Sequence, residues 1–191
     1  DQDHYACTSN KSKKNTFNYM ACSNITSGVL NGCSSNQGGL DAIFIANGPV
    51  ESITEAAGVV SAITVGGSPL VPADFFKFEV PRTTSSISET ATGDVMQGTV
   101  TYAQTAIMVL NQMQASTRDQ LKLMFEATNL VVVVKDNNGR AFSIGLLRGA
   151  YGETATSTSG VAYQDRNGYE ITISGIEADP MFEIDSAIVE A

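Results

Sequence analysis

The residue types that most often carry out catalysis or bind metals are few in this chain and lie near its start. The only histidine is His4, and the three cysteines are Cys7, Cys22 and Cys33. A serine–histidine–aspartate triad would depend on His4, and no Gly-x-Ser-x-Gly motif supplies a nucleophile. Zinc sites need clustered cysteine and histidine ligands, which this spacing does not provide. We therefore expect no catalytic residues, no metal site and no cofactor, and predict that the protein is not an enzyme.

Two further patterns resemble functional motifs but lack essential parts. Asp136-Asn137-Asn138-Gly139 is similar to the start of a calcium loop, but the terminal glutamate and the ligand spacing are missing. Gly66-Gly67-Ser68-Pro69 is not followed by the Gly-Lys-Ser/Thr of a phosphate-binding loop.

The odd number of cysteines argues against a closed disulfide framework. We expect reduced thiols, although a Cys22–Cys33 bridge stays possible.

Composition suits a threonine-rich β protein and equally a protein that buries its surface against partners, and it argues against tight binding to nucleic acid. The 191 residues suit one domain, and only 16% of them are charged, against about a quarter in an average soluble protein. The net charge of −9 argues against tight binding to phosphate backbones, which requires Lys and Arg. Ser, Thr, Asn and Gly dominate the polar residues, which suits β-structure and also burial against partners. No apolar run approaches the roughly 20 residues of a membrane span.

The strongest local signal is the run Leu130–Leu147, in which a valine-rich segment, a polar turn and an alternating segment follow one another. The Asn138-Gly139 pair at its turn predicts a type I′ hairpin, because both residues tolerate positive φ. The preceding residues 116–128 are predicted to form the one α-helix, with Thr117 and Gln120 as a capping box. Its buried stripe is predicted to consist of Leu121, Met124 and Phe125.

Most of the remaining chain is predicted to be strand. Residues 98–113 could be interpreted as a helix from Ala103, but their threonines and valines favour an extended chain. Residues 148–160 are predicted to be a flexible loop, and residues 1–37 an irregular N-terminal arm before a single domain, 38–191. Further strands are predicted at 40–46, 59–65, 75–80, 161–164, 168–175 and 181–184, with 50–54 and 85–90 as weaker candidates. About eight strands and one helix indicate a mainly β fold, a β-sandwich or barrel flanked by one helix.

Seven segments also follow one another in a familiar order. They are Gly38–Ala46, Phe75–Pro81, Ser85–Thr90, Thr99–Leu110, Arg118–Leu121, Val131–Arg140 and Asn167–Gly175. Together they resemble structural proteins of tailed bacteriophages, most closely the tail tube, or major tail, protein family. The resemblance covers roughly residues 38–184. It rests on the order of the segments, since none of them is a signature motif.

The resemblance implies a structural virion protein whose subunits close into hexameric rings, which stack into a hollow tube that conducts the genome. Its partners would be further copies of itself, other tail proteins and passing DNA without specific binding. It would be assembled in the host cytoplasm and located in the virion tail, with no membrane contact. In that family a long loop or hairpin between early strands reaches a neighbouring ring, and residues 59–78 are the candidate here. The implied interface residues are Ile63, Val65, Leu70, Val71 and Phe76.

The acidic balance predicts a lumen of net negative potential. A ring of six copies would carry 6 × −9 = −54 formal charges, which would keep DNA from adhering as it passes. Two alternatives stay open. One is a tail terminator or head–tail connector, which shares the fold but forms a single ring. The other is an extracellular β-sandwich binding module, which would be a monomer.

Overall fold

The computed structural model of the protein describes residues 27–29, 36–94 and 96–190. The chain divides into two compact units, Asp1–Ser35 and Asn36–Ala191, and the description below concerns the second. The predicted arm 1–37 therefore lies almost wholly outside the described residues. The same holds for the single histidine and the three cysteines considered above.

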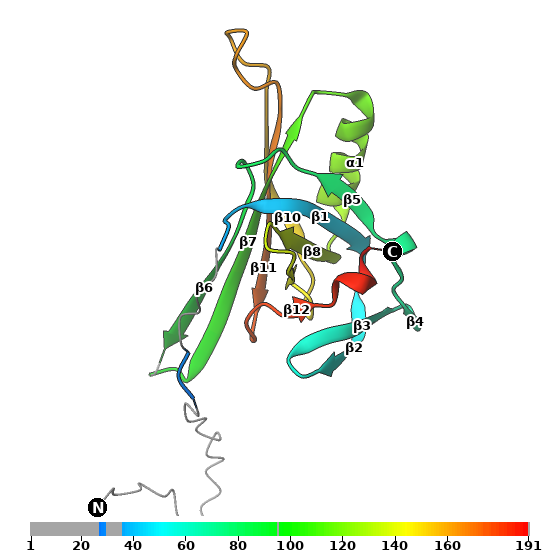
Figure 1. Ribbon diagram of the computed structural model, residues 1–191, viewed down its shortest axis with the longest axis vertical. Helices are drawn as coiled ribbons and strands as arrows, with labels where there is room; N and C mark the ends of the chain where they lie inside the picture. Colours follow the sequence, from blue (N-terminus) through cyan, green and yellow to red (C-terminus); the bar gives the residue numbers. More distant parts are fainter. Residues whose placement is uncertain (1–26, 30–35, 95, 191) are drawn as a thin grey trace, which may run out of the picture. The chain divides into compact units, whose positions relative to one another are not determined.

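Two β-sheets and one α-helix make up the second unit (Figure 1). Most of the strand pairs are antiparallel. Sheet A consists of β1 (Leu40–Asn47), β2 (Val50–Ala56), β3 (Val59–Val65), β4 (Ser68–Pro69), β5 (Phe76–Glu79), β8 (Leu130–Asp136), β9 (Ala141–Ile144) and β12 (Glu183–Ile184). Sheet B consists of β6 (Ser86–Asp94), β7 (Thr99–Asn111), β10 (Tyr151–Thr158) and β11 (Gly168–Glu177). The helix is α1 (Ala115–Glu126), and two 3-10 turns are η1 (Pro72–Asp74) and η2 (Ser186–Ile188). The predicted mainly β, sandwich-like fold with one helix is confirmed, and the barrel alternative is wrong because the sheets do not close.

The valine-rich strand β8 lies at the centre of sheet A, in the order β2-β3-β12-β9-β8-β1-β5. Successive side chains of a strand point to opposite faces. Val132 and Val134 accordingly join a core cluster with sheet B, whereas Val131 and Val133 join a second cluster with β3 and η2. A strand covered on both faces needs apolar residues at every position, which explains the unbroken valine run.

Sheet B has the order β10-β11-β7-β6, and all of its pairs are antiparallel. Its inner face buries Ala106 and Met108 of β7, which lie opposite Ile173 and Ile171 of β11. Leu121 and Met124 of α1 enter the same cluster, as do alternate residues of β8. Sheet A, sheet B and the helix therefore share one core.

The hairpin predicted at 130–147 is present as β8–β9, but its turn type is not the expected one. Of the turn residues only Gly139 has positive φ, at 83°, so a type I′ turn is excluded. The Gly139 N–H donates to the Asp136 carbonyl (3.1 Å), and the Asp136 N–H donates to the Arg140 carbonyl (2.9 Å). This is a three-residue loop that ends in a left-handed glycine. The Asp136 carboxylate stabilises it by accepting from the N–H groups of Asn138 and Arg140 (2.9 and 2.8 Å).

The helix lies where predicted, but the predicted capping interaction at its N-terminus is not formed. Its N-cap is Gln114, which makes no side-chain capping bond, so the predicted capping box of Thr117 and Gln120 is not formed. Of the predicted stripe, Leu121 and Met124 are buried while Phe125 stays exposed.

Two predictions near the C-terminal half were wrong. The predicted loop 148–160 contains the eight-residue strand β10, because β11 supplies a pairing partner along its whole length. The predicted strand 161–164 is a loop, because the Asp165 carboxylate accepts hydrogen bonds from the N–H groups of Val161 and Ala162 (2.8 Å each).

Candidate functional site

Sheet B has two long edges that no other strand of the described chain covers. Strand β6 pairs only with β7, and β10 pairs only with β11. Soluble proteins usually protect such edges with Lys, Pro, strong bulges or a covering segment, because open N–H and C=O groups attract further strands. Neither β6 nor β10 contains Lys, Arg or Pro, and the one irregularity is a register shift between Gly152 and Thr154. These two edges are therefore open to pairing with another chain.

The two edge strands share a tetrapeptide and run in opposite directions. Glu89-Thr90-Ala91-Thr92 lies in β6, and Glu153-Thr154-Ala155-Thr156 lies in β10. Three successive antiparallel pairings separate β10 from β6, so the two strands are antiparallel to each other. When two copies lie side by side in the same orientation, β6 of one and β10 of the other continue the antiparallel pattern of the sheet.

The outer face of sheet B, opposite the core, is rich in hydroxyl groups. The strand registers place these exposed hydroxyl-bearing residues on it: Ser86, Ser88, Thr90, Thr92, Thr99, Thr101, Thr154, Thr156 and Thr158. Glu170, Ala103, Tyr151 and Ile176 are also exposed on this face. None of the four strands contains a Lys or Arg. Their five carboxylates are Glu89, Asp94, Glu153, Glu170 and Glu177, which give the strands a formal charge of 0 − 5 = −5. Glu177 is buried, Glu89 bonds to buried Gln104, and Glu170 is paired with Arg166 (2.8 Å), so the outer face carries only part of this negative charge.

A buried polar cluster fixes one end of sheet B to the rest of the subunit. Gln104 is 2% exposed. Its amide nitrogen donates to Glu89 Oε2 (3.2 Å), and its amide oxygen accepts from the Gly145 N–H (2.9 Å). Glu177, which is 3% exposed, accepts from the N–H groups of Leu147 and Arg148 (3.0 and 2.7 Å). These bonds hold the β9–β10 connection against β6, β7 and β11.

Sequence reasoning missed this cluster because its members are far apart along the chain. A single long amide, Gln104, within a strand of threonines and apolar residues was the available signal. A buried amide must find hydrogen-bond partners, so it marks a point where segments meet.

The interface residues implied by the resemblance do not share one surface. Ile63 is completely buried in the core of its own subunit, so it is not available to a neighbour. Val65 and Leu70 are half-buried and pack against the same core. Val71 and Phe76 are 50% and 60% exposed, and they are the members of the set that a second copy could reach.

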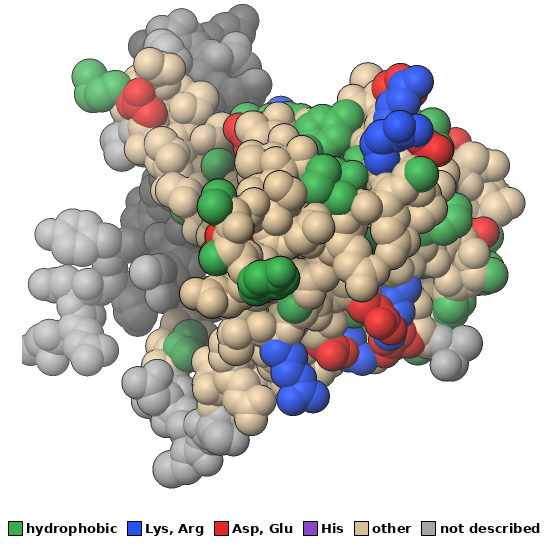
Figure 2. Space-filling model, turned by 90° about the horizontal axis from the view of Figure 1, so that it is seen from above, with side chains coloured by type: hydrophobic (Ala, Val, Ile, Leu, Met, Phe, Trp, Pro, Cys, Tyr) green, Lys and Arg blue, Asp and Glu red, His purple; other side chains and the backbone are tan. Residues whose placement is uncertain are grey.

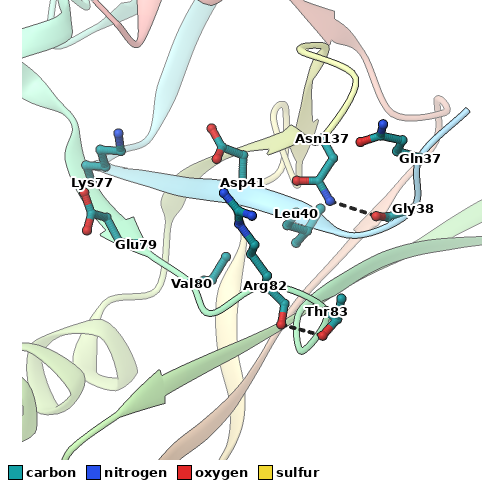
Figure 3. A pocket seen from close by; sticks show the side chains of 10 residues that line it. All are labelled: Gln37, Gly38, Leu40, Asp41, Lys77, Glu79, Val80, Arg82, Thr83 and Asn137. Atoms are coloured by element: carbon teal, nitrogen blue, oxygen red, sulfur yellow. Dashed lines mark hydrogen bonds between the residues drawn. The ribbon is translucent and has the colours of Figure 1, made fainter.

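A surface hollow lies beside the hairpin turn, between β1, β5 and residues 37–38 (Figure 3). It has a volume of about 580 Å³, and its charged lining residues are Asp41, Lys77, Glu79 and Arg82. Because two acids and two bases line this open hollow, it favours neither an anionic nor a cationic ligand. The hollow therefore provides no catalytic constellation.

The turn next to this hollow anchors the start of the described domain. The Asn137 amide donates to the Gly38 carbonyl (2.8 Å), as Figure 3 shows. The Asn138 side chain donates to the Gln37 carbonyl (2.9 Å) and accepts from the Gln37 N–H (2.9 Å). The residues that resemble the start of a calcium loop therefore bind the chain itself.

A charged cluster holds the end of the described chain on sheet A. Glu190 accepts a hydrogen bond from Lys135 and lies 3.7 Å from the Lys77 ammonium. The hydrogen bond from Lys135 is the main cause that lowers the pKa of Glu190, and the same bond raises the pKa of Lys135. The pair fastens η2 over the second core cluster, which is a structural role.

Neither metal ligation nor similarity to known proteins adds a further candidate. Over residues 27–29, 36–94 and 96–190, no group of three or more His, Cys, Asp or Glu side chains is placed to hold a metal ion. Among the described helices none is long and apolar enough to cross a membrane. No family model matches the sequence, and no curated protein or solved structure matches it significantly. Function is therefore inferred from the geometry of sheet B and from the resemblance described above.

Proposed function

We propose that the protein is a tail tube subunit of a tailed bacteriophage, which self-assembles through the edges of sheet B into rings that stack into a conduit for DNA. The observation that carries this proposal is the pair of long, unprotected, oppositely running edges on one four-stranded sheet. A monomer with such edges is prone to uncontrolled association. A ring in which every edge meets its complement removes both edges at once.

The edges specify a head-to-tail contact. Each subunit offers β6 on one side and β10 on the other, so an interface joins two different surfaces and passes to the next copy. Heterologous contacts of this kind generate closed rings when the rotation between neighbours fits. The resemblance to tail tube proteins implies six copies in the ring.

The outer face of sheet B suits the lining of a DNA conduit. The opposite face is filled by the core shared with sheet A and α1, so only the hydroxyl-rich face is free to border a lumen. Threonine and serine present small polar groups, and the carboxylates repel phosphates. Passage requires weak binding, because each Lys–phosphate contact would retard the DNA.

The open edges also separate this proposal from its alternatives. An extracellular binding module that works as a monomer would need protected edges, which sheet B lacks. A terminator or connector would use the same edges but form a single ring, and electron microscopy distinguishes single rings from tubes. The exposed apolar residues at both ends of sheet B favour stacking, as argued in the next subsection.

The shared tetrapeptide supplies a charge-swap experiment. Ala91 and Ala155 occupy its third position on the two edges and are both exposed. We expect Ala91→Asp with Ala155→Asp to prevent ring formation, because two acids then meet at each seam beside Glu89 and Glu153. Ala91→Asp with Ala155→Lys should assemble, because a head-to-tail seam then joins Asp to Lys. The matched control, Ala91→Ser with Ala155→Ser, should behave as the wild type.

Sedimentation velocity and negative-stain electron microscopy measure the outcome, and circular dichroism checks the fold of each variant. Rings from the Asp/Asp variant at wild-type yield would overturn edge pairing. If like edges pair instead, the Asp/Lys variant joins Asp to Asp and Lys to Lys. Failure of that variant to form rings would therefore contradict the head-to-tail contact.

A further inference from the structure

The two ends of sheet B carry different loops. Asp94 pairs with Thr99 at the end where β6 turns into β7, and Gly168 pairs with Asn111 at the end where β10 passes into β11. Figure 1 shows the β10–β11 loop in orange at the top and the β6–β7 turn in green at the bottom. The 13 residues of β7 separate them by about 43 Å, at roughly 3.3 Å per residue.

Both loops present large apolar side chains to solvent. Met96 of the β6–β7 turn is 95% exposed, and Val100 beside it is about half exposed. Val161 and Tyr163 of the β10–β11 loop are as exposed as in an extended chain. Figure 2 looks onto the end with the β10–β11 loop, where hydrophobic side chains are exposed between groups of neighbouring basic and acidic residues.

An aspartate in each loop accepts hydrogen bonds from backbone N–H groups at or next to the residues that carry the apolar side chains. Asp94 accepts from the N–H groups of Met96 and Gln97 (2.8 and 3.1 Å). Asp165 accepts from the N–H groups of Val161 and Ala162, and these bonds lower the pKa of its carboxyl group. Exposed apolar side chains whose neighbouring backbone is hydrogen-bonded suit docking, because less ordering is needed on binding.

The β10–β11 loop also depends on a glycine. Gly160 has a φ of 69°, and a side chain there would approach Asp165 Cβ to 2.4 Å. Only glycine therefore fits beside the aspartate. The Arg166–Glu170 ion pair (2.8 Å) closes the base of the loop.

We propose that the β10–β11 loop of one copy docks on the β6–β7 turn of a copy in the next ring, with Val161 and Tyr163 packed against Met96 and Val100. This inference rests on the proposed function. Ring closure through the edges of sheet B gives all copies one axial direction, so each ring presents only β10–β11 loops at one rim and only β6–β7 turns at the other. Unlike ends then meet at every junction, and the contact repeats without closing, which produces a tube.

The chemistry of the two ends fits this pairing. Tyr163 offers an aromatic ring and Met96 a polarisable thioether, a favourable combination. Burial removes from water the most exposed large side chains of the described domain. This pairing differs from the contact at residues 59–78 that the resemblance implies.

The inference is tested by removing the apolar groups from one loop. Val161→Ser with Tyr163→Ser should leave rings intact but reduce the fraction of subunits in tubes by about tenfold or more, because several equivalent contacts are lost at each junction. The matched control, Leu123→Ser with Leu147→Ser, removes exposed apolar groups outside both loops and should retain tubes. Electron microscopy counts rings and tubes. Wild-type tube yield from the Val161/Tyr163 variant would overturn the inference and leave the edge proposal standing.

A cross-link gives a second, positive readout. In a background with Cys7, Cys22 and Cys33 replaced by Ser, Gln97→Cys with Ala162→Cys leaves the apolar contact residues in place and should form disulfide-linked multimers in tubes under oxidation. Either cysteine alone should yield almost no multimers. Assembled tubes without cross-links would contradict the contact. A wild-type protein that stays monomeric would overturn this inference and the proposed function together.

Discussion

Sheet A and sheet B use β-structure for different purposes. In sheet A, β1 and β8 are covered on both faces, and the edge strand β5 is only four residues long and carries Lys77. In sheet B only one face enters the core, and both edge strands are long and lack bases. Sheet A therefore supplies the stability of the subunit, while sheet B keeps a face and two edges free for assembly.

The sharpest test of this difference compares a core residue of sheet A with an outer residue of sheet B. Phe44→Ala should lower the free energy of unfolding by about 3–5 kcal/mol, because Phe44 is 2% exposed and its loss leaves a cavity. Thr101→Ala, on the exposed outer face, should change it by about 0.5 kcal/mol or less. Urea unfolding of the dissociated subunit measures both. Equal effects would contradict the division of roles.

The second prediction concerns the polar cluster that joins the two sheets. Glu177→Ala should destabilise the subunit by about 1–3 kcal/mol, because the N–H groups of Leu147 and Arg148 lose their buried acceptor. Glu55→Ala, at an exposed position of β2, is the control and should cost about 0.5 kcal/mol or less. A loss in Glu177→Ala no larger than the control's would show that the cluster does not hold the sheets together.

The third prediction adds bases to the face that lacks them. Thr99→Lys with Thr101→Lys should make assembled rings or tubes retain DNA, with an affinity that falls about tenfold or more between 50 and 200 mM salt. The wild type should bind DNA weakly even at low salt. Gel-shift and filter-binding assays give the comparison, and Thr99→Gln with Thr101→Gln controls for size. Tight DNA binding by the wild type would contradict a repelling lumen.

The smallest expected effect lies at the charged cluster of sheet A. The pKa of Glu190 is lowered in the folded protein, so its contribution is complete above the ordinary value of 4.5 and is lost as the pH falls through the lowered value. The pKa of Lys135 is raised, so its contribution is complete below 10.5 and is lost as the pH rises through the raised value. The effect should be about 1 kcal/mol or less, because both groups are partly exposed. Glu190→Gln should remove the acid branch of this pH dependence in thermal unfolding, and an unchanged profile would refute the pairing.

Local patterns predicted the fold well where an element is defined by its own residues. Three elements could be predicted from their own residue patterns. They are β7, with its threonines and valines, β8, with its valine run, and α1, with its apolar stripe. The turn of the β8–β9 hairpin was predicted in place but not in type, since the Asp136 side chain favours a different loop around Gly139. Strand β10 looked like a loop because its small polar residues form a strand only against β11.

The candidate site was harder to predict because it depends on which strands are neighbours. An edge strand is one that has a neighbouring strand on one side only. The residues of the strand do not show this, because it depends on the strand order of the whole sheet. The repeated Glu-Thr-Ala-Thr at 89–92 and 153–156 is visible in the sequence, yet its meaning needs the strand order that puts both copies on edges. Ile63 lies in the segment that the resemblance assigns to a contact between rings, but it is completely buried in a core cluster that also contains residues of β12 and η2.

Sedimentation velocity of the purified wild-type chain over a wide concentration range, with electron microscopy of the same samples, tests the central claim most directly. The account predicts rings with a central opening and, at higher concentration, tubes built from them, together with loss of both in the Ala91→Asp, Ala155→Asp variant. A single species of 20.1 kDa that persists at the highest concentration would contradict it.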